Sequence, residues 1–300
     1  MMFGTREAFT YYECGACGCV QIARYPDDIA RHYPRDYYAF ASGAAGEARH
    51  YSRAARWLHH RRARHGLGYF DPIGALVSRA FGELEAHRWL KMAGVRFESS
   101  ILEVGCGTGF LLSLLWRDGF RNLEGVDPFI PDAARHQPGF TIKSALGEAQ
   151  RRADFILMSH SLEHMPEPHR VLAELRAISS QRTWLCVRLP LACAAYRRFG
   201  GDWGQLDPPR HFYLHTPRSF ALLAETHGFR VERTLFDSTA LQFWWSEQNL
   251  RDVAFNDPRS HAGPHGALFS PSQMAAWEAE ASALNAAGEG DQATFFLRPT

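Results

Sequence analysis

The chain carries three alternating glycines, Gly105, Gly107 and Gly109. They separate a short apolar segment that starts at Ile101 from a second apolar segment over residues 110–116. We expect a strand, a tight turn and a helix here, because glycine adopts turn conformations that other residues avoid and a helix start offers unpaired N–H groups. Such a turn lets a ligand lie against bare backbone. The spacing therefore predicts a cofactor site.

Nearby side chains restrict the class of cofactor. A dinucleotide site needs a third glycine three residues after the second, and that position holds Phe110. Glu103 would repel a phosphate but suits a ligand with an ammonium group. Asp127 lies at the end of the next apolar segment, where an acid can accept hydrogen bonds from two ribose hydroxyls. We expect a ligand that contains a ribose without a neighbouring phosphate.

The sequence E-V-G-C-G-T-G at 103–109, followed by G-V-D at 125–127, resembles the S-adenosylmethionine site of class I methyltransferases. In that family the acid after the second strand holds the ribose, and the segment after the third strand lies near the adenine. The resemblance implies S-adenosylmethionine as cofactor and the following contact residues: Glu103, Gly105, Gly107, Gly109, Asp127, Glu148 and Ser159.

A histidine-rich segment, MSHSLEHMPEP at 158–168, follows the fourth predicted strand. Polar residues at the carboxyl ends of parallel strands project into the crevice where such sheets bind ligands. The segment resembles the S-H-x-x-E-H-x-x-x-P stretch of small-molecule and sugar methyltransferases. We interpret His164 as a general base. An imidazole with a pKa of ~6.5 is largely neutral at cellular pH, so it can accept a proton. His211 and His160 are further catalytic candidates. Alternatively, Glu163 and His164 cap the following helix.

The same side chains allow a metal site as another interpretation. On a helix, His160, Glu163 and His164 would share one face, and His211 could complete the ligand set. Related clusters in some methyltransferases begin with an acid, where this chain has His160. Our preferred assignment contains no metal ligand, and the sequence leaves the question open.

The apolar segments around these residues alternate between strand and helix patterns. This order predicts an α/β fold with a mainly parallel sheet and helices on both faces. The resemblance implies a Rossmann-like sheet of seven strands that ends in an antiparallel pair, 229–236 and 293–297. Residues 237–292 are then an insertion on the substrate side.

Two further helices have clear sequence patterns. Residues 73–92 have apolar residues near helical spacing, so we predict one amphipathic helix that packs on the sheet. A second helix should begin after Thr216, which suits an N-cap, with Pro217 at its first position, and should end at Gly228.

The proposed insertion begins with a tryptophan pair, Trp244 and Trp245. We expect these rings to dock the insertion onto the domain, because large apolar side chains are usually buried. Contact with the acceptor is then more suited to Gln242 and Glu247.

Residues 1–68 differ in composition from the predicted methyltransferase domain, 69–300, and we interpret them as an extension. Cys14 and Cys17 form a knuckle of the kind found in zinc ribbons, but no second C-x-x-C follows. We expect a metal-free remnant, because His32 or His50 would have to complete the set. The arginine-rich segment 49–65 is expected to be a solvated linker helix, with an anion or RNA surface as the alternative.

The overall charge of the chain is balanced, with 33 Lys and Arg against 32 Asp and Glu. Neither nucleic acid nor an anionic membrane is favoured as a partner. The six cysteines lack the spacing of a secreted disulfide scaffold, and we find neither a signal peptide nor an apolar run of ~18 residues. We therefore predict a cytoplasmic enzyme.

These observations favour a methyltransferase acting on a small molecule, with a hydroxyl of a sugar, glycan or natural product as the acceptor. An RNA 2'-O-methyltransferase and a non-catalytic S-adenosylmethionine-binding subunit are the alternatives. The sequence leaves open the acceptor atom and the oligomeric state.

Overall fold

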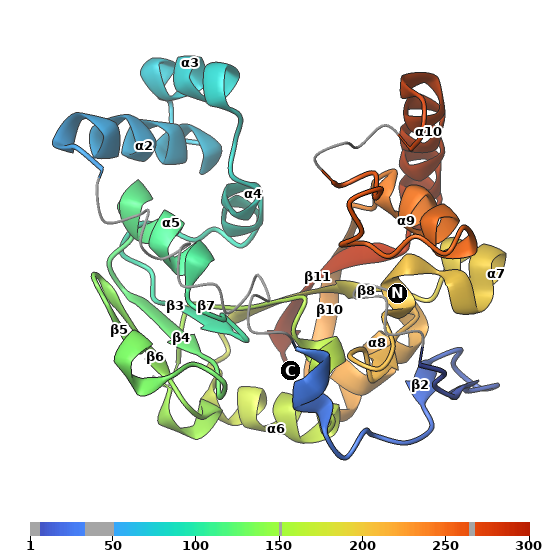
Figure 1. Cartoon of the computed structure of the whole chain (residues 1–300). Helices are drawn as coiled ribbons and strands as arrows, with labels where there is room; N and C mark the ends of the chain where they lie inside the picture. The colour runs from blue at the N-terminus through green and yellow to red at the C-terminus, as the bar shows by residue number, and fades with distance from the viewer. Residues whose placement is uncertain (1–6, 34–50, 150–151, 264–267) are drawn as a thin grey trace.

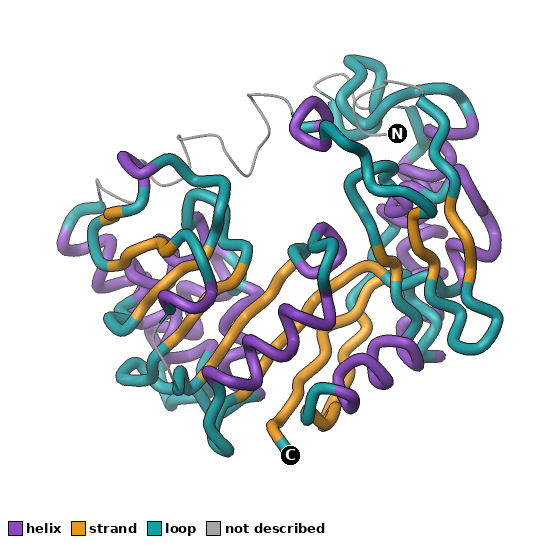
Figure 2. Tube along the Cα trace, turned by 90° about the horizontal axis from the view of Figure 1, so that it is seen from below, coloured by secondary structure: helices purple, strands orange, loops and turns teal. Residues whose placement is uncertain are grey.

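The computed structural model describes residues 7–33, 51–149, 152–263 and 268–300. A large sheet with strand order β10-β11-β8-β7-β3-β4-β6-β5 runs through the centre of the molecule (Figures 1 and 2). Its strands are β3 (Ile101–Val104), β4 (Leu123–Val126), β5 (His136–Gln137), β6 (Phe140–Lys143), β7 (Phe155–Ser159), β8 (Trp184–Pro190), β10 (Phe229–Phe236) and β11 (Gln292–Pro299).

The sheet has the predicted direction of strands and one strand more than expected. Strand β3 pairs in parallel with β4 and β7, and β8 continues the parallel part beside β7. Strand β11 runs antiparallel between β8 and β10, which confirms the antiparallel edge. The eighth strand arises because the two-residue β5 folds back on β6 at the opposite edge. The carboxyl ends of β3 and β7 therefore lie side by side.

The helices are α2 (Arg53–Gly66), α3 (Pro72–Phe81), α4 (Glu85–Met92), α5 (Phe110–Asp118), α6 (Pro168–Ile178), α7 (Ala194–Phe199), α8 (Pro217–Thr226), α9 (Leu241–Leu250) and α10 (Pro271–Ala287). Single turns of 3₁₀ helix are η1 (Ile29–His32), η3 (Asp132–Ala134), η4 (Leu146–Glu148), η5 (Leu162–His164), η6 (Gly200–Asp202) and η7 (Gly204–Leu206). Of the helices in these described residues, none has the length and apolarity that a membrane crossing requires.

Alternating strand residues build a core on each face of the sheet. Ile101 and Leu157 pack with α4 and α5, whereas Leu102 and Ile156 pack with α6 and α8. Figure 1 shows α4 and α5 on one side of the sheet and α6 on the other. The expected layered arrangement is confirmed.

The single helix predicted over 73–92 is wrong. Gly82 has φ of +74° and ends α3, and α4 begins three residues later. Only α4 packs on the sheet, while Leu76 and Phe81 on α3 are 70% and 78% exposed. The spacing of the apolar residues did not indicate a break at Gly82, because a single glycine inside a helical pattern is often tolerated.

The expected linker helix is packed against the domain. In α2, Arg62 and Ala63 are buried, and the Arg56 guanidinium lies 4.9 Å from the centre of the Trp116 ring on α5. Two residues at the start of the arginine-rich segment, Arg49 and His50, lie outside the described residues.

A second, three-stranded sheet joins the N-terminal residues to the middle of the chain. It consists of β1 (Tyr11–Glu13), β2 (Val20–Ile22) and β9 (Tyr213–Leu214), all antiparallel. Strand β9 follows the segment that carries His211, so the extension packs directly beside this candidate residue.

Candidate functional site

The glycine turn joins β3 to α5, and all three glycines have positive φ, between +52° and +78°. A Cβ at Gly105 would lie 2.3 Å from the Ser161 Cβ, and a Cβ at Gly109 would lie 2.5 Å from the Phe140 ring. These two glycines are thus required by neighbouring protein side chains as well as by their conformation.

Asp127 lies at the end of β4 and turns toward the glycine turn. Its Oδ2 accepts a hydrogen bond from the Gly107 N–H at 2.9 Å, and its Oδ1 accepts one from the Phe129 N–H at 2.9 Å. Burial raises the pKa of this carboxyl above its ordinary value. Each oxygen keeps a second lone pair, so the carboxylate can accept further hydrogen bonds from a ribose.

Glu103 is a buried acid beside the same turn. Its Oε2 has no hydrogen-bond partner, and burial together with the charge of Asp127 raises its pKa to about 8. An unpartnered buried carboxylate is costly, and an ammonium group placed against it would remove that cost. Glu103 and Asp127 therefore fit the amino acid and ribose parts of the expected cofactor.

The remaining predicted cofactor residues lie farther out. Glu148, on η4, is exposed, and its Oε1 accepts a hydrogen bond from the Ser144 hydroxyl at 2.7 Å. Ser159 is the half-buried last residue of β7 and stands opposite Arg188 of β8. Among the described hydrogen bonds, none links Glu148 or Ser159 to the glycine turn.

His160 follows β7 with a positive φ of +50°, which is uncommon for a residue other than glycine. Its Nε2 accepts a hydrogen bond from the Arg188 guanidinium at 2.8 Å, because a guanidinium can only donate. The proton of a neutral ring is then on Nδ1, which lies 3.3 Å from Glu163 Oε1. Both ring nitrogens are occupied, so His160 orients Glu163.

Glu163 is 1% exposed, and its Oε2 has no hydrogen-bond partner. Burial alone would raise its pKa, but the His160 hydrogen bond and the charge of His164 outweigh burial and lower the pKa to about 2. The residue does not cap the next helix, because α6 begins after Glu167 without a side-chain cap. Glu163 is a buried, ionised carboxylate with one open oxygen.

His164 and His211 lie side by side, with ring centroids 4.7 Å apart. The Nδ1 of His164 is 2.9 Å from the Arg210 carbonyl oxygen, and the Nδ1 of His211 is 2.7 Å from the Gln205 carbonyl oxygen. Carbonyls only accept, so each Nδ1 donates and each neutral ring has its lone pair on Nε2. Burial and the charge of His164 lower the pKa of His211 to about 4.

We call Glu163, His164 and His211 the acceptor cluster. Each offers one potential ligand atom, and the three atoms lie within 4.8 Å of one another. The Phe212 N–H donates to the Glu163 carbonyl at 2.7 Å, which brings two distant segments together. Ser161, between β7 and the cluster, donates to the Val104 carbonyl at 3.0 Å. The cluster therefore lies at the same sheet edge as the glycine turn.

The N-terminal extension supplies two residues that sequence reasoning missed. The Tyr33 hydroxyl lies 3.3 Å from the His164 Nδ1, and the Tyr11 hydroxyl donates to the His211 carbonyl at 2.8 Å. These contacts span more than a hundred residues of chain, and no local pattern around either tyrosine indicates them.

The cysteine knuckle docks on the domain. The Gly18 N–H donates to the Cys14 carbonyl at 2.7 Å, and the Cys17 carbonyl accepts a hydrogen bond from the Thr216 hydroxyl at 2.7 Å. His32 is buried, and its Nε2 lies 3.8 Å from the Glu7 Oε2. His50 lies outside the described residues. The metal-free knuckle stays a prediction.

The tryptophan pair has the docking role expected from the sequence. Both rings are buried, Trp244 stacks on Phe255 at 5.6 Å, and Trp245 packs directly on Gly204. Gln242 is buried with its Oε1 unpartnered, whereas Glu247 lies 3.7 Å from Arg251.

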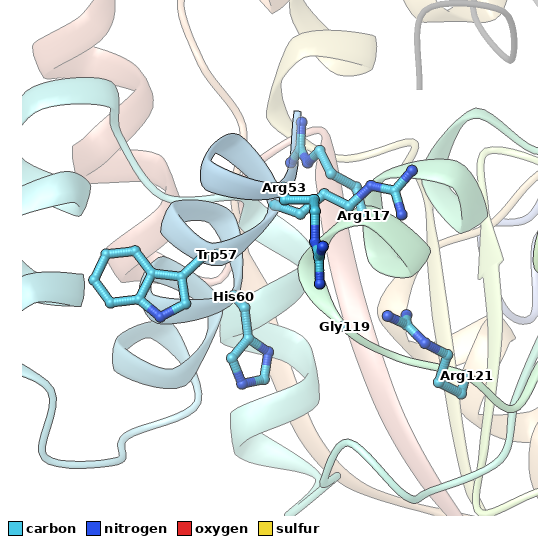
Figure 3. Close-up of a pocket in the computed structure, with 7 residues that line it drawn as sticks. Arg53, Trp57, His60, Arg117, Gly119 and Arg121 are labelled. Atoms are coloured by element: carbon cyan, nitrogen blue, oxygen red, sulfur yellow. The ribbon is translucent and has the colours of Figure 1, made fainter. Parts of the chain in front are cut away.

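An arginine-lined pocket of about 390 Å³ lies between α2 and the end of α5. Figure 3 shows Trp57 and His60 of α2 together with Arg53, Arg117, Gly119 and Arg121, and Arg56 completes the lining. Gly119 follows the C-terminus of α5, whereas the glycine turn precedes its N-terminus. The nine residues of this helix separate the pocket from the cofactor site by about 13 Å.

Comparison with known proteins gives a short match to one curated protein and matches to solved structures. EEF1A lysine methyltransferase 2 from Danio rerio is 36% identical over 64 residues, which cover 20% of this chain and 28% of the relative. The chain thus spans just over a quarter of that relative's length.

The solved structures that resemble the chain include two further methyltransferases. A SAM dependent methyltransferase from Archaeoglobus fulgidus has a TM-score of 0.45 and 18% identity, and the match covers 75% of this chain and 99% of that one. The mitomycin 7-O-methyltransferase MmcR has a TM-score of 0.43 and 17% identity over 97% of this chain and 80% of that one.

One family profile, described as "Methyltransferase domain", matches residues 53–234, which is more than half of the chain. The chain therefore belongs to this methyltransferase family and is an S-adenosylmethionine-dependent methyltransferase.

Proposed function

We propose that this enzyme methylates a hydroxyl group of a small molecule, such as a sugar, glycan or natural product, held over the acceptor cluster. The observation that carries the proposal is the buried Glu163, with one carboxylate oxygen unpartnered, beside two histidines whose Nδ1 atoms are hydrogen-bonded to backbone carbonyls. A hydroxyl must lose its proton to attack a methyl group, and an anionic cluster with basic nitrogens suits that task.

The chain's own residues position the reactants. Glu103 and the glycine turn would hold the amino acid part of S-adenosylmethionine, and Asp127 the ribose. When bound, this cofactor supplies the methyl group, and the positive charge on its sulfur is lost as the methyl leaves. Ser161 fixes the acceptor cluster against the end of β3, so the two halves of the site have a defined spacing.

The acceptor cluster takes the proton of the hydroxyl. His164 is half-buried and faces His211, and we assign the proton to the His164 Nε2, because burial lowers the pKa of His211 to about 4 and makes it the weaker base. We assign His160 a positioning role, because both of its ring nitrogens are bound and it holds Glu163.

The RNA alternative is less well supported. It needs an arginine surface beside the acceptor cluster, and the arginine-lined pocket lies at the opposite end of α5. A small acceptor does not need such a surface.

We further propose that residues 69–300 form the catalytic domain and that the first part of the extension, 1–68, completes its acceptor side. Tyr11 and Tyr33 support this division of roles through their contacts with the cluster. The family match itself begins at residue 53, within α2.

The proposal predicts separate effects on the two halves of the site. Asp127→Ala should weaken S-adenosylmethionine binding by about 10-fold or more, because the ribose loses a charged hydrogen-bond acceptor. His164→Ala and His211→Ala should keep cofactor affinity and lose turnover. Calorimetric titration with S-adenosylmethionine and methyl transfer to a panel of hydroxylated metabolites and RNA check both. Turnover on RNA alone would contradict the proposal.

A further inference from the structure

We propose that the acceptor cluster is a binding site for a divalent transition metal, with Glu163, His164 and His211 as ligands. Two imidazoles and one carboxylate are a common three-residue donor set for such ions. The inference rests on the proposed function in taking a hydroxyl as the acceptor, whose oxygen would occupy an open coordination position. It changes one part of that proposal, because an Nε2 atom that binds the ion cannot also take the proton of the hydroxyl.

Hydrogen bonds already orient both histidines as metal ligands. Each Nδ1 is tied to a backbone carbonyl, of Arg210 for one ring and of Gln205 for the other. Histidines that bind metals typically donate the other ring N–H to a carbonyl or carboxylate, which fixes the tautomer and turns the lone pair to the ion. Here that arrangement leaves Nε2 as the donor atom on both rings.

The three donor atoms lie close together without satisfying one another. One ligand atom from each of the three residues lies within 4.8 Å of the other two, and Glu163 Oε2 has no hydrogen-bond partner. The His211 Nε2 lies 3.9 Å from the Asp207 Oδ2, which is beyond hydrogen-bond distance. Leaving a buried carboxylate oxygen unpaired is costly. A cation between the three atoms would stabilise all of them.

His160 is not a metal ligand in this proposal. The presence of histidine where related clusters have an acid therefore does not count against a metal site. Its two nitrogens bind Arg188 and Glu163, so the residue at the first position of the H-x-x-E-H segment orients a ligand. Three protein ligands instead of four leave a coordination position open, as in catalytic sites.

The donor set also indicates the ion and its task. Imidazole nitrogens favour zinc or ferrous iron over magnesium or calcium. Such an ion lowers the pKa of an oxygen that it binds, so the acceptor hydroxyl would release its proton to water near neutral pH. The new C–O bond then forms as the C–S bond of the cofactor breaks.

Cobalt(II) provides a probe of the site that is independent of turnover. The protein is stripped with a chelator and titrated with Co²⁺, and visible absorption and bound metal per chain are recorded. A Cys14→Ser, Cys17→Ser double variant removes the two cysteines of the knuckle. We expect about one Co²⁺ per chain in the wild type and in this double variant, because neither cysteine belongs to the cluster.

Variants of the cluster identify the ligands. Each cluster variant is made in the Cys14→Ser, Cys17→Ser protein. We expect Co²⁺ binding to weaken by at least about 10-fold in His164→Ala, in His211→Ala and in Glu163→Gln. His169→Ala is the control, because His169 is an exposed histidine on α6 outside the cluster. Thermal unfolding and S-adenosylmethionine affinity show that the variants are folded. Unchanged Co²⁺ binding in all three cluster variants would overturn the metal site.

The outcomes separate this inference from the proposed function. If metal-free protein methylates hydroxyl acceptors as fast as the metal-loaded protein, the metal proposal fails and methylation by the cluster alone stands. If Co²⁺ binds to the cluster but no hydroxylated compound is methylated, the metal site stands and the proposed acceptor class fails.

Discussion

Glu103 and Glu163 are both buried glutamates, yet the protein shifts their pKa values in opposite directions. Burial and the nearby Asp127 raise the pKa of Glu103, whereas His160 and His164 outweigh burial and lower that of Glu163. The two acids suit different tasks. In our proposal, Glu103 binds the ammonium group of the cofactor, and Glu163 is the anion on the acceptor side.

The pKa of Glu103 predicts how stability depends on pH. In the unfolded chain this carboxyl ionises near 4.5, but in the folded, cofactor-free protein it ionises only near 8. Its contribution to stability is therefore fully present below 4.5 and is lost as the pH rises to about 8. Glu103→Gln cannot ionise, so its Tm should rise relative to the wild type by at least about 2–4 °C across this range.

Thermal unfolding without cofactor from pH 4.5 to 9 checks this prediction. His211 and His215, with pKa values lowered to about 4, change stability in the opposite direction below pH 6.5. Both proteins share that effect, so the difference in Tm is the quantity to compare. A difference that stays constant with pH would show that Glu103 does not carry the shifted pKa.

At the scale of elements, the site depends on where the loops after β3 and β7 touch. The glycine turn and Ser161 pack so closely that a Cβ at Gly105 would lie 2.3 Å from the Cβ of Ser161. This contact joins the cofactor side to the acceptor side, because Ser161 precedes the acceptor cluster in sequence. A change in one loop must therefore disturb the other.

Gly105→Ala should disrupt both sides. A positive φ costs a residue with a Cβ about 1–2 kcal/mol, and the overlap with Ser161 adds about 1–3 kcal/mol. Gly94→Ala is the matched control, since Gly94 also has positive φ but no atom lies within 4 Å of its Cβ position. Urea unfolding measures both costs. Equal losses in the two variants would mean that the Ser161 contact is relieved at no cost.

On the scale of the whole molecule, the N-terminal strands rest on a different core from the glycine turn. The glycine turn packs with the cores of the large sheet, whereas a third core holds Val20 of β2, Leu214 of β9 and the aromatic side chains of α9. Residues 7–33 of the extension are thus part of the acceptor side, whereas α2, which also belongs to the extension, packs on α5 at the cofactor side.

Val20→Asp should impair the acceptor side alone. This residue is 0% exposed between β1 and β9, and burying its charge would undock the extension from the segment that carries His211. We expect kcat to fall about 10-fold or more, while the affinity for S-adenosylmethionine stays within about 2-fold. Tyr12→Asp on the neighbouring strand is the control, because Tyr12 is 50% exposed. Equal loss of cofactor binding in Val20→Asp would contradict separate cores.

The sequence by itself determined the parts whose signals are local. The turn after β3, the acid at the end of β4, the alternation of strands and helices, and the start of α8 at Thr216 all follow from spacing and capping within a few residues. Such patterns act through neighbouring backbone atoms, so they can be recognised without knowing the fold.

Only the tertiary structure decided which side chains meet. It placed His211 against His164, tied both nitrogens of His160, left one oxygen of Glu163 open and brought Tyr33 to the cluster. These contacts join segments far apart in the chain, and packing of the whole molecule selects them. The sequence listed the ligating side chains in order, but their distances, hydrogen bonds and burial exist only after the chain has folded.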